Sequence, residues 1–266
     1  MATSTSAIRT LKGIEAQVRI AGSGDPVLFL HGAGGLQPSE PLLDALAERY
    51  TVHAAEWPGF GEQPTEQLIE DMLDFSLHGW DVVEALGLGA EKPHLIGHSM
   101  GGMIAGEMAA LNPRGLGKLV LMNASGLWMD NHPIPDIFAM LPFELADVLF
   151  ADPKAGEAFL AGGANFNDDA ALKVFLVTNA RRFGTAGKIL FPIPNRRLSK
   201  RLYRVTNDTL LLWGAQDRLI VPAYATRYAE LLSSARVQLI EQAGHMLPYE
   251  QPTAAAEAID AFLSEA

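Results

Sequence analysis

The fold of this chain is decided by the stretch HLIGHSMGG, which runs from His94 to Gly102. The run begins with apolar residues typical of a buried strand, and the residues from Met100 onward have helical periodicity. Between strand and helix stands the pattern G-x-S-x-G, centred on Ser99. Glycines two places before and after the serine permit a turn so tight that the serine adopts a strained backbone conformation. The stretch therefore predicts a serine hydroxyl raised above the edge of a sheet.

Short apolar runs alternate with amphipathic stretches on both sides of this turn. Such alternation is typical of a mostly parallel sheet with crossover helices. Because the runs are apolar almost throughout, we expect these strands to be buried on both faces. Residues 14–20 alternate instead, which predicts an antiparallel edge hairpin with the residues before them. The predicted strands are Val27–Leu30, Val52–Ala55, His94–Ile96, Lys118–Met122, Thr209–Trp213 and Val237–Ile240, and the predicted helices are Pro41–Arg49, Met72–Leu86, Met100–Leu111, Ala223–Leu232 and Thr253–Leu263.

The alternation of strands and helices is interrupted once, over residues 126–207. This segment holds several prolines and eight of the 12 phenylalanines of the chain. We interpret it as a mainly helical cap inserted into one core domain, which comprises residues 1–125 and 208–266. If aromatic side chains such as Trp128 and Phe138 line a pocket beneath the cap, its ligand has an apolar part.

The composition argues against several classes of function. With 31 acidic and 20 basic residues the net charge is −11, which opposes binding to nucleic acid. The chain has no cysteine, so disulfides, thiolate metal sites and cysteine nucleophiles are excluded. No apolar run approaches the roughly 18 residues that span a bilayer, and the first residues lack the apolar core of a signal peptide. We expect a soluble cytoplasmic protein that acts on a small molecule, without membrane insertion or a metal, and its oligomeric state stays open.

A serine hydroxyl becomes a good nucleophile when a base takes its proton and an acid orients that base. Of the seven histidines, His245 follows the last predicted strand, in a loop at the sheet edge where Ser99 emerges. Asp217 lies just past the penultimate strand, beside that loop, and Asp130 is the reserve candidate. Asn123 follows the strand before, but an amide cannot serve as the acid. We predict that Ser99, His245 and Asp217 act as nucleophile, base and orienting acid.

The negative oxygen that develops during acyl transfer needs preorganised N–H donors. One donor is expected to be the amide of Met100, and the second to come from the glycine-rich loop HGAGG, from Ala33 or alternatively Gly34. His31 begins that loop, and we expect it to shape the loop and to lie near the substrate. His98 adjoins the nucleophile but is expected to point away from it.

With these residues in place, the chain resembles the α/β-hydrolase superfamily. The resemblance implies an eight-stranded, mostly parallel sheet, no cofactor, and a lid at residues 126–207. The order Ser, Asp, His along the chain is the one found in that fold. The matching stretches are Phe29–Gly32, Trp57–Gly61, Gly97–Gly102, Leu212–Asp217 and Ala243–Pro252.

We predict a serine hydrolase that cleaves the carboxylic ester of a small, partly apolar substrate through an acyl-enzyme. Carbon–carbon bond hydrolases of the superfamily, which act on vinylogous diketone ring-fission products, share the serine and the cap. They tend, however, to have asparagine where His98 stands and tryptophan where Met246 stands, a position expected to contact substrate. A third alternative is a non-catalytic receptor for a small molecule, because such receptors can retain the triad.

A run of basic residues in the cap bears on this choice. Residues 181–204 contain eight basic and no acidic side chains, a pattern that is usually a solvated helix face. The sharper hypothesis is that Arg181 or Arg182 binds a substrate carboxylate through two parallel N–H donors. That hypothesis favours carbon–carbon bond hydrolysis or an acidic ester.

Overall fold

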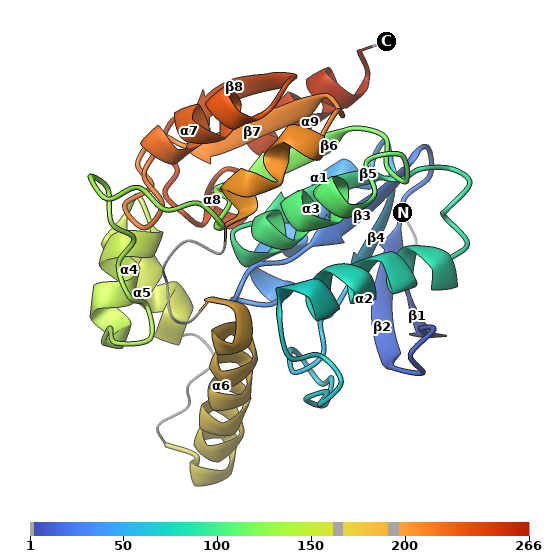
Figure 1. The fold of residues 1–266 in the computed structure, drawn as a ribbon. Helices are drawn as coiled ribbons and strands as arrows, with labels where there is room; N and C mark the ends of the chain where they lie inside the picture. The colour runs from blue at the N-terminus through green and yellow to red at the C-terminus, as the bar shows by residue number, and fades with distance from the viewer. Residues whose placement is uncertain (1–2, 162–166, 191–196, 266) are drawn as a thin grey trace.

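The computed structural model describes residues 3–161, 167–190 and 197–265, which include one eight-stranded sheet with the order β1-β2-β4-β3-β5-β6-β7-β8 (Figure 1). β1 pairs with β2, and β2 with β4, in antiparallel fashion, whereas all other neighbours are parallel. The predicted edge hairpin and mostly parallel sheet are thus confirmed. The strands are β1 Thr3–Arg9, β2 Glu15–Ala21, β3 Pro26–Leu30, β4 Thr51–Ala55, β5 His94–His98, β6 Leu119–Met122, β7 Thr209–Gly214 and β8 Ala235–Ile240.

Helices cover both faces of the sheet and bury its apolar side chains (Figure 1). On one face α2, α3 and α7 pack into a core that includes Trp57 and Trp213, and on the other α1 and α9 pack around Phe29 and Val120. These helices match the predicted ones to within a few residues at each end. Their bounds are α1 Glu40–Leu46, α2 Met72–Ala85, α3 Met100–Leu111, α7 Ala223–Leu231 and α9 Pro252–Leu263, preceded by the one-turn helix α8 Leu247–Glu250.

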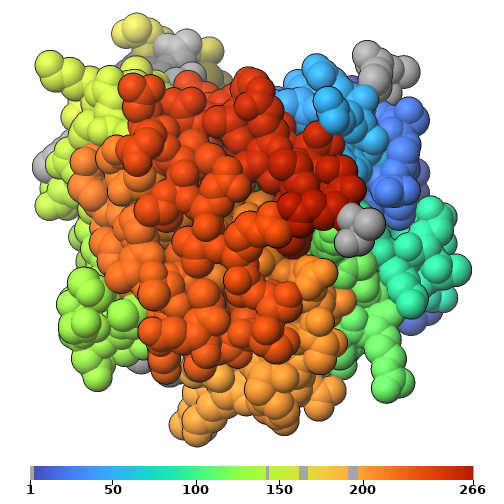
Figure 2. All heavy atoms as spheres, turned by 90° about the horizontal axis from the view of Figure 1, so that it is seen from above, coloured from blue at the N-terminus to red at the C-terminus, as the bar shows by residue number. Residues whose placement is uncertain are grey.

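The expectation that every apolar strand is buried on both faces is wrong for β8. Val237 and Leu239 of this strand are 40% and 47% exposed. The physical reason is position, because β8 is the last strand of the sheet and the helices that pack on the two faces leave its apolar side chains partly uncovered. Figure 2 looks onto this part of the molecule, where the last third of the chain forms most of the visible face in orange and red.

The chain between β6 and β7 is mainly helical over the described residues, as predicted. It contains α4 Pro142–Leu149, α5 Pro153–Ala161, α6 Asp169–Leu190 and the short 3₁₀ helices η2 Leu198–Lys200 and η3 Leu202–Arg204. Residues 162–166 and 191–196 of the expected cap lie outside the described residues. Figure 1 shows α6 projecting from the body, with its C-terminal half nearest the sheet. Within the described ranges, no helix has both the length and the apolar character needed to cross a bilayer.

Candidate active site

The turn after β5 explains why the pattern G-x-S-x-G needs its glycines. Ser99 has φ 54° and ψ −116°, a strained conformation for a residue with a side chain. A Cβ atom added at Gly97 would lie 2.4 Å from the carbonyl oxygen of Gly101. One added at Gly101 would lie 2.0 Å from the carbonyl oxygen of Leu30, at the end of β3. The backbone therefore passes so close to its neighbours that hydrogen alone fits at both positions.

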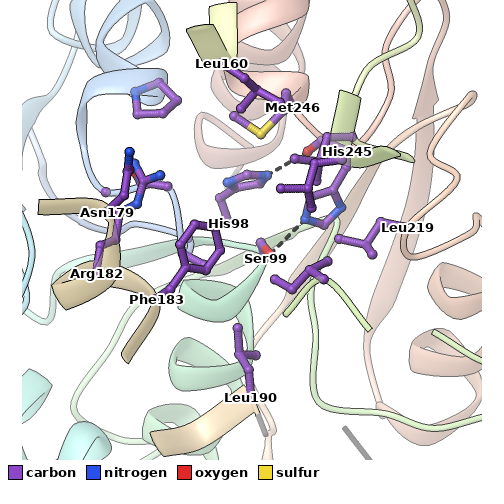
Figure 3. Close-up of a pocket in the computed structure, with 18 of the residues that line it drawn as sticks. His98, Ser99, Leu160, Asn179, Arg182, Phe183, Leu190, Leu219, His245 and Met246 are labelled. Carbon is purple, nitrogen blue, oxygen red and sulfur yellow. Dashed lines mark hydrogen bonds between the residues drawn. The ribbon is translucent and has the colours of Figure 1, made fainter. Parts of the chain in front are cut away.

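Three side chains predicted from distant parts of the sequence form one chain of hydrogen bonds. The Ser99 Oγ atom lies 2.8 Å from His245 Nε2 (Figure 3). On the other side of the ring, His245 Nδ1 lies 2.9 Å from Asp217 Oδ2. All three residues are buried: the exposed fraction is 7% for Ser99 and 2% for both His245 and Asp217. Because a carboxylate accepts but does not donate, Nδ1 carries the proton, and Nε2 is left to accept from the serine hydroxyl.

The Asp217 carboxylate is held by more than the imidazole. Its Oδ1 atom accepts from the amides of Leu219 and Ile220, both at 2.9 Å. Its Oδ2 atom accepts from Asn123 Nδ2 at 2.6 Å as well as from His245. Asn123 is fully buried, with φ 44°, at the end of β6. The residue type excludes Asn123 as the acid, and the sequence does not predict that it donates to the acid.

His98 does not point away from the site as expected. Its Nε2–H donates to the carbonyl oxygen of His245 at 2.8 Å, and the two rings lie 5.3 Å apart (Figure 3). The ring also lines the cavity beside Ser99. Burial lowers the pKa of His98 to about 3, so the ring is neutral at physiological pH. The expectation failed because the turn brings this residue under the His245 loop, a contact that is invisible in the sequence.

Glu250 supports the same loop from the other side. Its carboxylate accepts from the amide of Gly244 at 2.8 Å and from that of Ala151, beyond α4, at 2.7 Å. Burial raises the pKa of this carboxyl group, while the two amide donors oppose the rise. His98 and Glu250 therefore hold the backbone on both sides of His245. Glu250 also links the His245 loop to the chain after α4.

The loop after β3 is braced by His31 from the protein interior. The His31 Nε2 atom accepts from the amide of Trp57 at 3.1 Å, so Nδ1 carries the proton and donates to the carbonyl oxygen of Gly32 at 2.7 Å. The same oxygen accepts from the amide of Gly35 at 3.1 Å and closes the turn. Burial lowers the pKa of His31 to about 4. His31 shapes the loop, as predicted, and it is not among the described residues that line the cavity beside Ser99.

A cavity of about 980 Å³ opens above Ser99. Ala33 and Gly34, the predicted oxyanion residues, lie in its wall, and Met100 begins α3 directly after the serine. Most of the wall is apolar and comes from both the sheet end and the helices between β6 and β7. Among the described residues of that wall are Leu127, Ile134, Ile137, Phe138, Leu145, Leu149, Phe159, Val174, Phe175, Phe183, Leu190, Leu219, Ile220 and Met246.

The predicted substrate contacts divide into two groups. Phe138 and Met246 line the cavity, as expected. Trp128 and Arg181 do not: the indole of Trp128 donates to Asp130 at 2.9 Å, and Arg181 donates to the carbonyl oxygen of Gly61. Arg182, the alternative to Arg181, lies in the wall instead (Figure 3). Adjacent residues of a helix point about 100° apart, so one of the two faces the cavity and its neighbour faces a core loop.

Metal ligation finds no support in the part of the chain that the structure describes. There, no group of three or more His, Asp or Glu side chains is placed to hold an ion. The polar groups that reach the cavity are instead hydroxyls, imidazoles, amides and one guanidinium, from residues that include Ser99, Ser125, His98, His245, Asn179 and Arg182. Such a set can carry out proton transfer and nucleophilic attack without a metal ion.

Comparison with known proteins shows which proteins this chain is similar to. A 2-hydroxy-6-oxo-6-phenylhexa-2,4-dienoate hydrolase of Comamonas testosteroni is 28% identical over 263 residues, which cover 87% of this chain and 85% of the relative. A pimeloyl-[acyl-carrier protein] methyl ester esterase of Aeromonas hydrophila is 28% identical over 250 residues, 91% and 96% of the two chains. The solved meta-cleavage product hydrolase of Pseudomonas fluorescens IP01 shares the fold, with a TM-score of 0.78 at 21% identity over 97% of each chain. The profile of the Alpha/beta hydrolase family matches residues 27–258, and the chain therefore belongs to that family.

Proposed function

We propose that this protein is a serine hydrolase that cleaves a carboxylic ester of a partly apolar substrate through an acyl-enzyme. One observation carries the proposal: the hydrogen-bond chain Ser99–His245–Asp217 ends on a hydroxyl at the floor of a large apolar cavity. A buried serine, imidazole and carboxylate joined in this order have the geometry of nucleophilic acyl transfer. The esterase relative from Aeromonas hydrophila is consistent with this chemistry.

The mechanism follows from the protonation states that the hydrogen bonds define. Ser99 Oγ attacks the ester carbonyl carbon while His245 Nε2 takes the hydroxyl proton, and Asp217 stabilises the imidazolium that forms. The amides of Met100 and Ala33, with Gly34 as the alternative, donate to the negative oxygen of the tetrahedral intermediate. His245 returns the proton to the departing alcohol. A water molecule, activated by the same imidazole, then releases the carboxylic acid and restores Ser99.

We further propose that residues 126–207 form a cap that covers this cavity, with residues 1–125 and 208–266 as the catalytic core. In support, α4, α5 and α6 each contribute side chains to the cavity wall, among them Leu145, Phe159 and Phe183. An apolar wall favours the acyl or alcohol part of an ester over water. The cap would thereby select partly apolar substrates.

Turnover of p-nitrophenyl acetate and butyrate tests the role of Ser99. Ser99→Ala is expected to lower kcat/KM by several orders of magnitude, because catalysis then rests on the oxyanion donors and binding alone. Ser125→Ala is the matched control, since Ser125 also lines the cavity but has no bond to His245. Labelling by a fluorophosphonate should require Ser99. Undiminished turnover by Ser99→Ala would reject the mechanism, whereas labelling without turnover on any substrate would favour a receptor.

A second candidate function is hydrolysis of a carbon–carbon bond beside a ketone. It is favoured by Arg182, a guanidinium in the wall of the same apolar cavity, because a fork of N–H donors suits a substrate carboxylate. The relative from Comamonas testosteroni is named for a substrate that carries both a ketone and a carboxylate. Activity on such keto acids, together with inactivity on neutral esters, would establish this function in place of ester hydrolysis.

A further inference from the structure

Three cationic side chains of α6 donate hydrogen bonds to backbone carbonyl groups of the core. They are spaced along the C-terminal half of the helix, the part nearest the sheet (Figure 1). The hydrogen bonds run from Arg181 to Gly61, from Arg182 to Gly34, and from Lys188 to Glu66 and Ile69. α6 is therefore held against two loops of the core, the connection between β4 and α2 and the loop after β3 that is expected to supply an oxyanion donor.

The bond from Arg182 reaches a single peptide group of that loop. Arg182 Nη1 donates to the carbonyl oxygen of Gly34 at 3.2 Å. The N–H of the same peptide group belongs to Gly35 and donates to the carbonyl oxygen of Gly32 at 3.1 Å. Both ends of the Gly34–Gly35 peptide are thus held, one by the turn itself and one by α6. His31 holds the Gly32 carbonyl from the interior, at 2.7 Å.

We propose that Arg182 is a positioning residue that holds the oxyanion loop in its catalytic shape from the cap side. The inference rests on the proposed serine-hydrolase function, because it requires the loop to donate to a developing oxyanion. When α6 is seated, Arg182 fixes the Gly34 carbonyl and with it the direction of the neighbouring amides. When α6 is displaced, the loop of four small residues after His31 keeps its interior brace alone.

The loop needs a brace from outside because of its composition. Gly32, Gly34 and Gly35 have no side chains with which to pack, and Gly35 has φ 83°. Glycine peptides rotate readily, so a loop of this kind depends on hydrogen bonds to hold one conformation. Oxyanion donors act through preorganisation, and a donor that must first rotate into place loses part of its effect.

The electrostatics are consistent with a guanidinium close to the loop. Burial is the main cause that lowers the pKa of His31, and the charge of Arg182 lowers it further. Burial also lowers the pKa of Arg182 itself, which fits a cation held between the cavity and a backbone carbonyl. The guanidinium also lies 5.3 Å from the centre of the Phe183 ring. These contacts orient Arg182 without any substrate.

The role proposed here differs in its consequences from recognition of a substrate carboxylate. A residue that binds a carboxylate affects KM for acidic substrates and has no effect on neutral ones. A residue that positions the oxyanion loop affects kcat for every ester, because the tetrahedral intermediate forms whatever the substrate charge. A neutral ester therefore separates the two roles.

The experiment compares Arg182→Gln, Arg182→Lys and Arg181→Gln with the wild-type protein on p-nitrophenyl butyrate. Arg182→Gln is expected to lower kcat about 10- to 100-fold, less than the 10²–10³-fold typical of a lost donor, with KM changed less than about threefold. Arg182→Lys should recover part of kcat, since an ammonium can still donate one bond. Arg181→Gln, which breaks the bond to Gly61, should stay within about twofold of wild type. Affinity for a neutral trifluoromethyl ketone, which mimics the tetrahedral intermediate, should fall in parallel with kcat/KM.

Several results would overturn the inference. An unchanged kcat in Arg182→Gln would do so. An equal loss of kcat in Arg181→Gln would also do so, because it would mean that any contact between α6 and the core has the same effect. Urea unfolding of each variant identifies a loss that comes from misfolding, because the free energy of unfolding would then fall together with kcat. Failure of the proposed function looks different, because the wild type would then be inert or Ser99→Ala equally active.

Discussion

Replacing Asn123 by aspartate tests the buried network behind the imidazole. Asn123 Nδ2 lies 2.6 Å from Asp217 Oδ2, and the two side chains are 0% and 2% exposed. Asn123→Asp keeps the size of the side chain, and both residue types tolerate the left-handed backbone found here, with φ 44°. The substitution therefore changes a neutral donor into a second carboxyl group and little else.

The magnitude can be worked from this distance. Two unit charges 2.6 Å apart repel by roughly 6 kcal/mol at an effective dielectric constant of about 20, which corresponds to between four and five pKa units. The folded variant should therefore keep one proton shared between the two carboxyl groups at pH 7, whereas the unfolded chain loses both. Above about pH 4 the folded state binds one proton more, so the free energy of unfolding falls with rising pH by about 1.4 kcal/mol per unit relative to wild type. At pH 7, three units above pH 4, the variant has therefore lost about 4 kcal/mol of its free energy of unfolding relative to wild type.

Urea unfolding at pH 5, 6, 7 and 8 measures this slope. Asn123→Ala is the matched control, because it removes the donor without adding a charge and should cost about 1–3 kcal/mol independently of pH. The free energies of unfolding of the two variants are expected to diverge steadily as the pH rises. If the free energy of unfolding of Asn123→Asp runs parallel to that of wild type across this range, the two carboxyl groups do not interact as the structure implies.

Two further predictions concern buried positions of the core, the first with a control substitution on α6. Gly101→Ala should lower the free energy of unfolding by about 3 kcal/mol or more and abolish the proposed ester hydrolysis, because its Cβ would lie 2.0 Å from the Leu30 oxygen. Gly184→Ala is the matched control in α6: its Cβ would meet no atom within 4 Å, so it should instead stabilise the helix by about 0.5–1 kcal/mol. Equal stability of the two variants in urea would contradict this account of the turn. His78 is buried, and burial lowers its pKa to about 4, so stability is lost as the pH falls from about 6.5 toward 4. His78→Leu should make the pH dependence of unfolding shallower by up to about 1.4 kcal/mol per unit in that window, and an unchanged slope would show that His78 does not titrate there.

Some features of this protein were determined by short runs of sequence. The turn at Ser99 is one, because its geometry leaves room for hydrogen alone at Gly97 and Gly101. This requirement appears in the sequence as two glycines at fixed distances from the serine. The parallel strands are another, since apolar runs of four to six residues can be buried in few other ways. Once those strands are placed, their carboxyl ends share one edge, and Asp217 and His245 follow from topology.

Other features depended on contacts that no local pattern encodes. The bond from Asn123 to Asp217 and that from His98 to the His245 carbonyl join residues far apart in the chain. The exposure of apolar side chains on β8 depended on the position of this strand at the edge of the sheet. The apolar composition of the strand does not reveal that position.

The choice between the two arginines of α6 illustrates the same limit most clearly. Arg181 and Arg182 are identical in chemistry and adjacent in sequence, yet one reaches Gly61 and the other reaches the cavity and Gly34. Sequence determines that a helix carries both residues, and that they point about 100° apart. The rotation of the helix about its own axis is determined by how its buried residues, Thr185, Ala186 and Ile189, pack on the core, and that packing exists only in the tertiary structure.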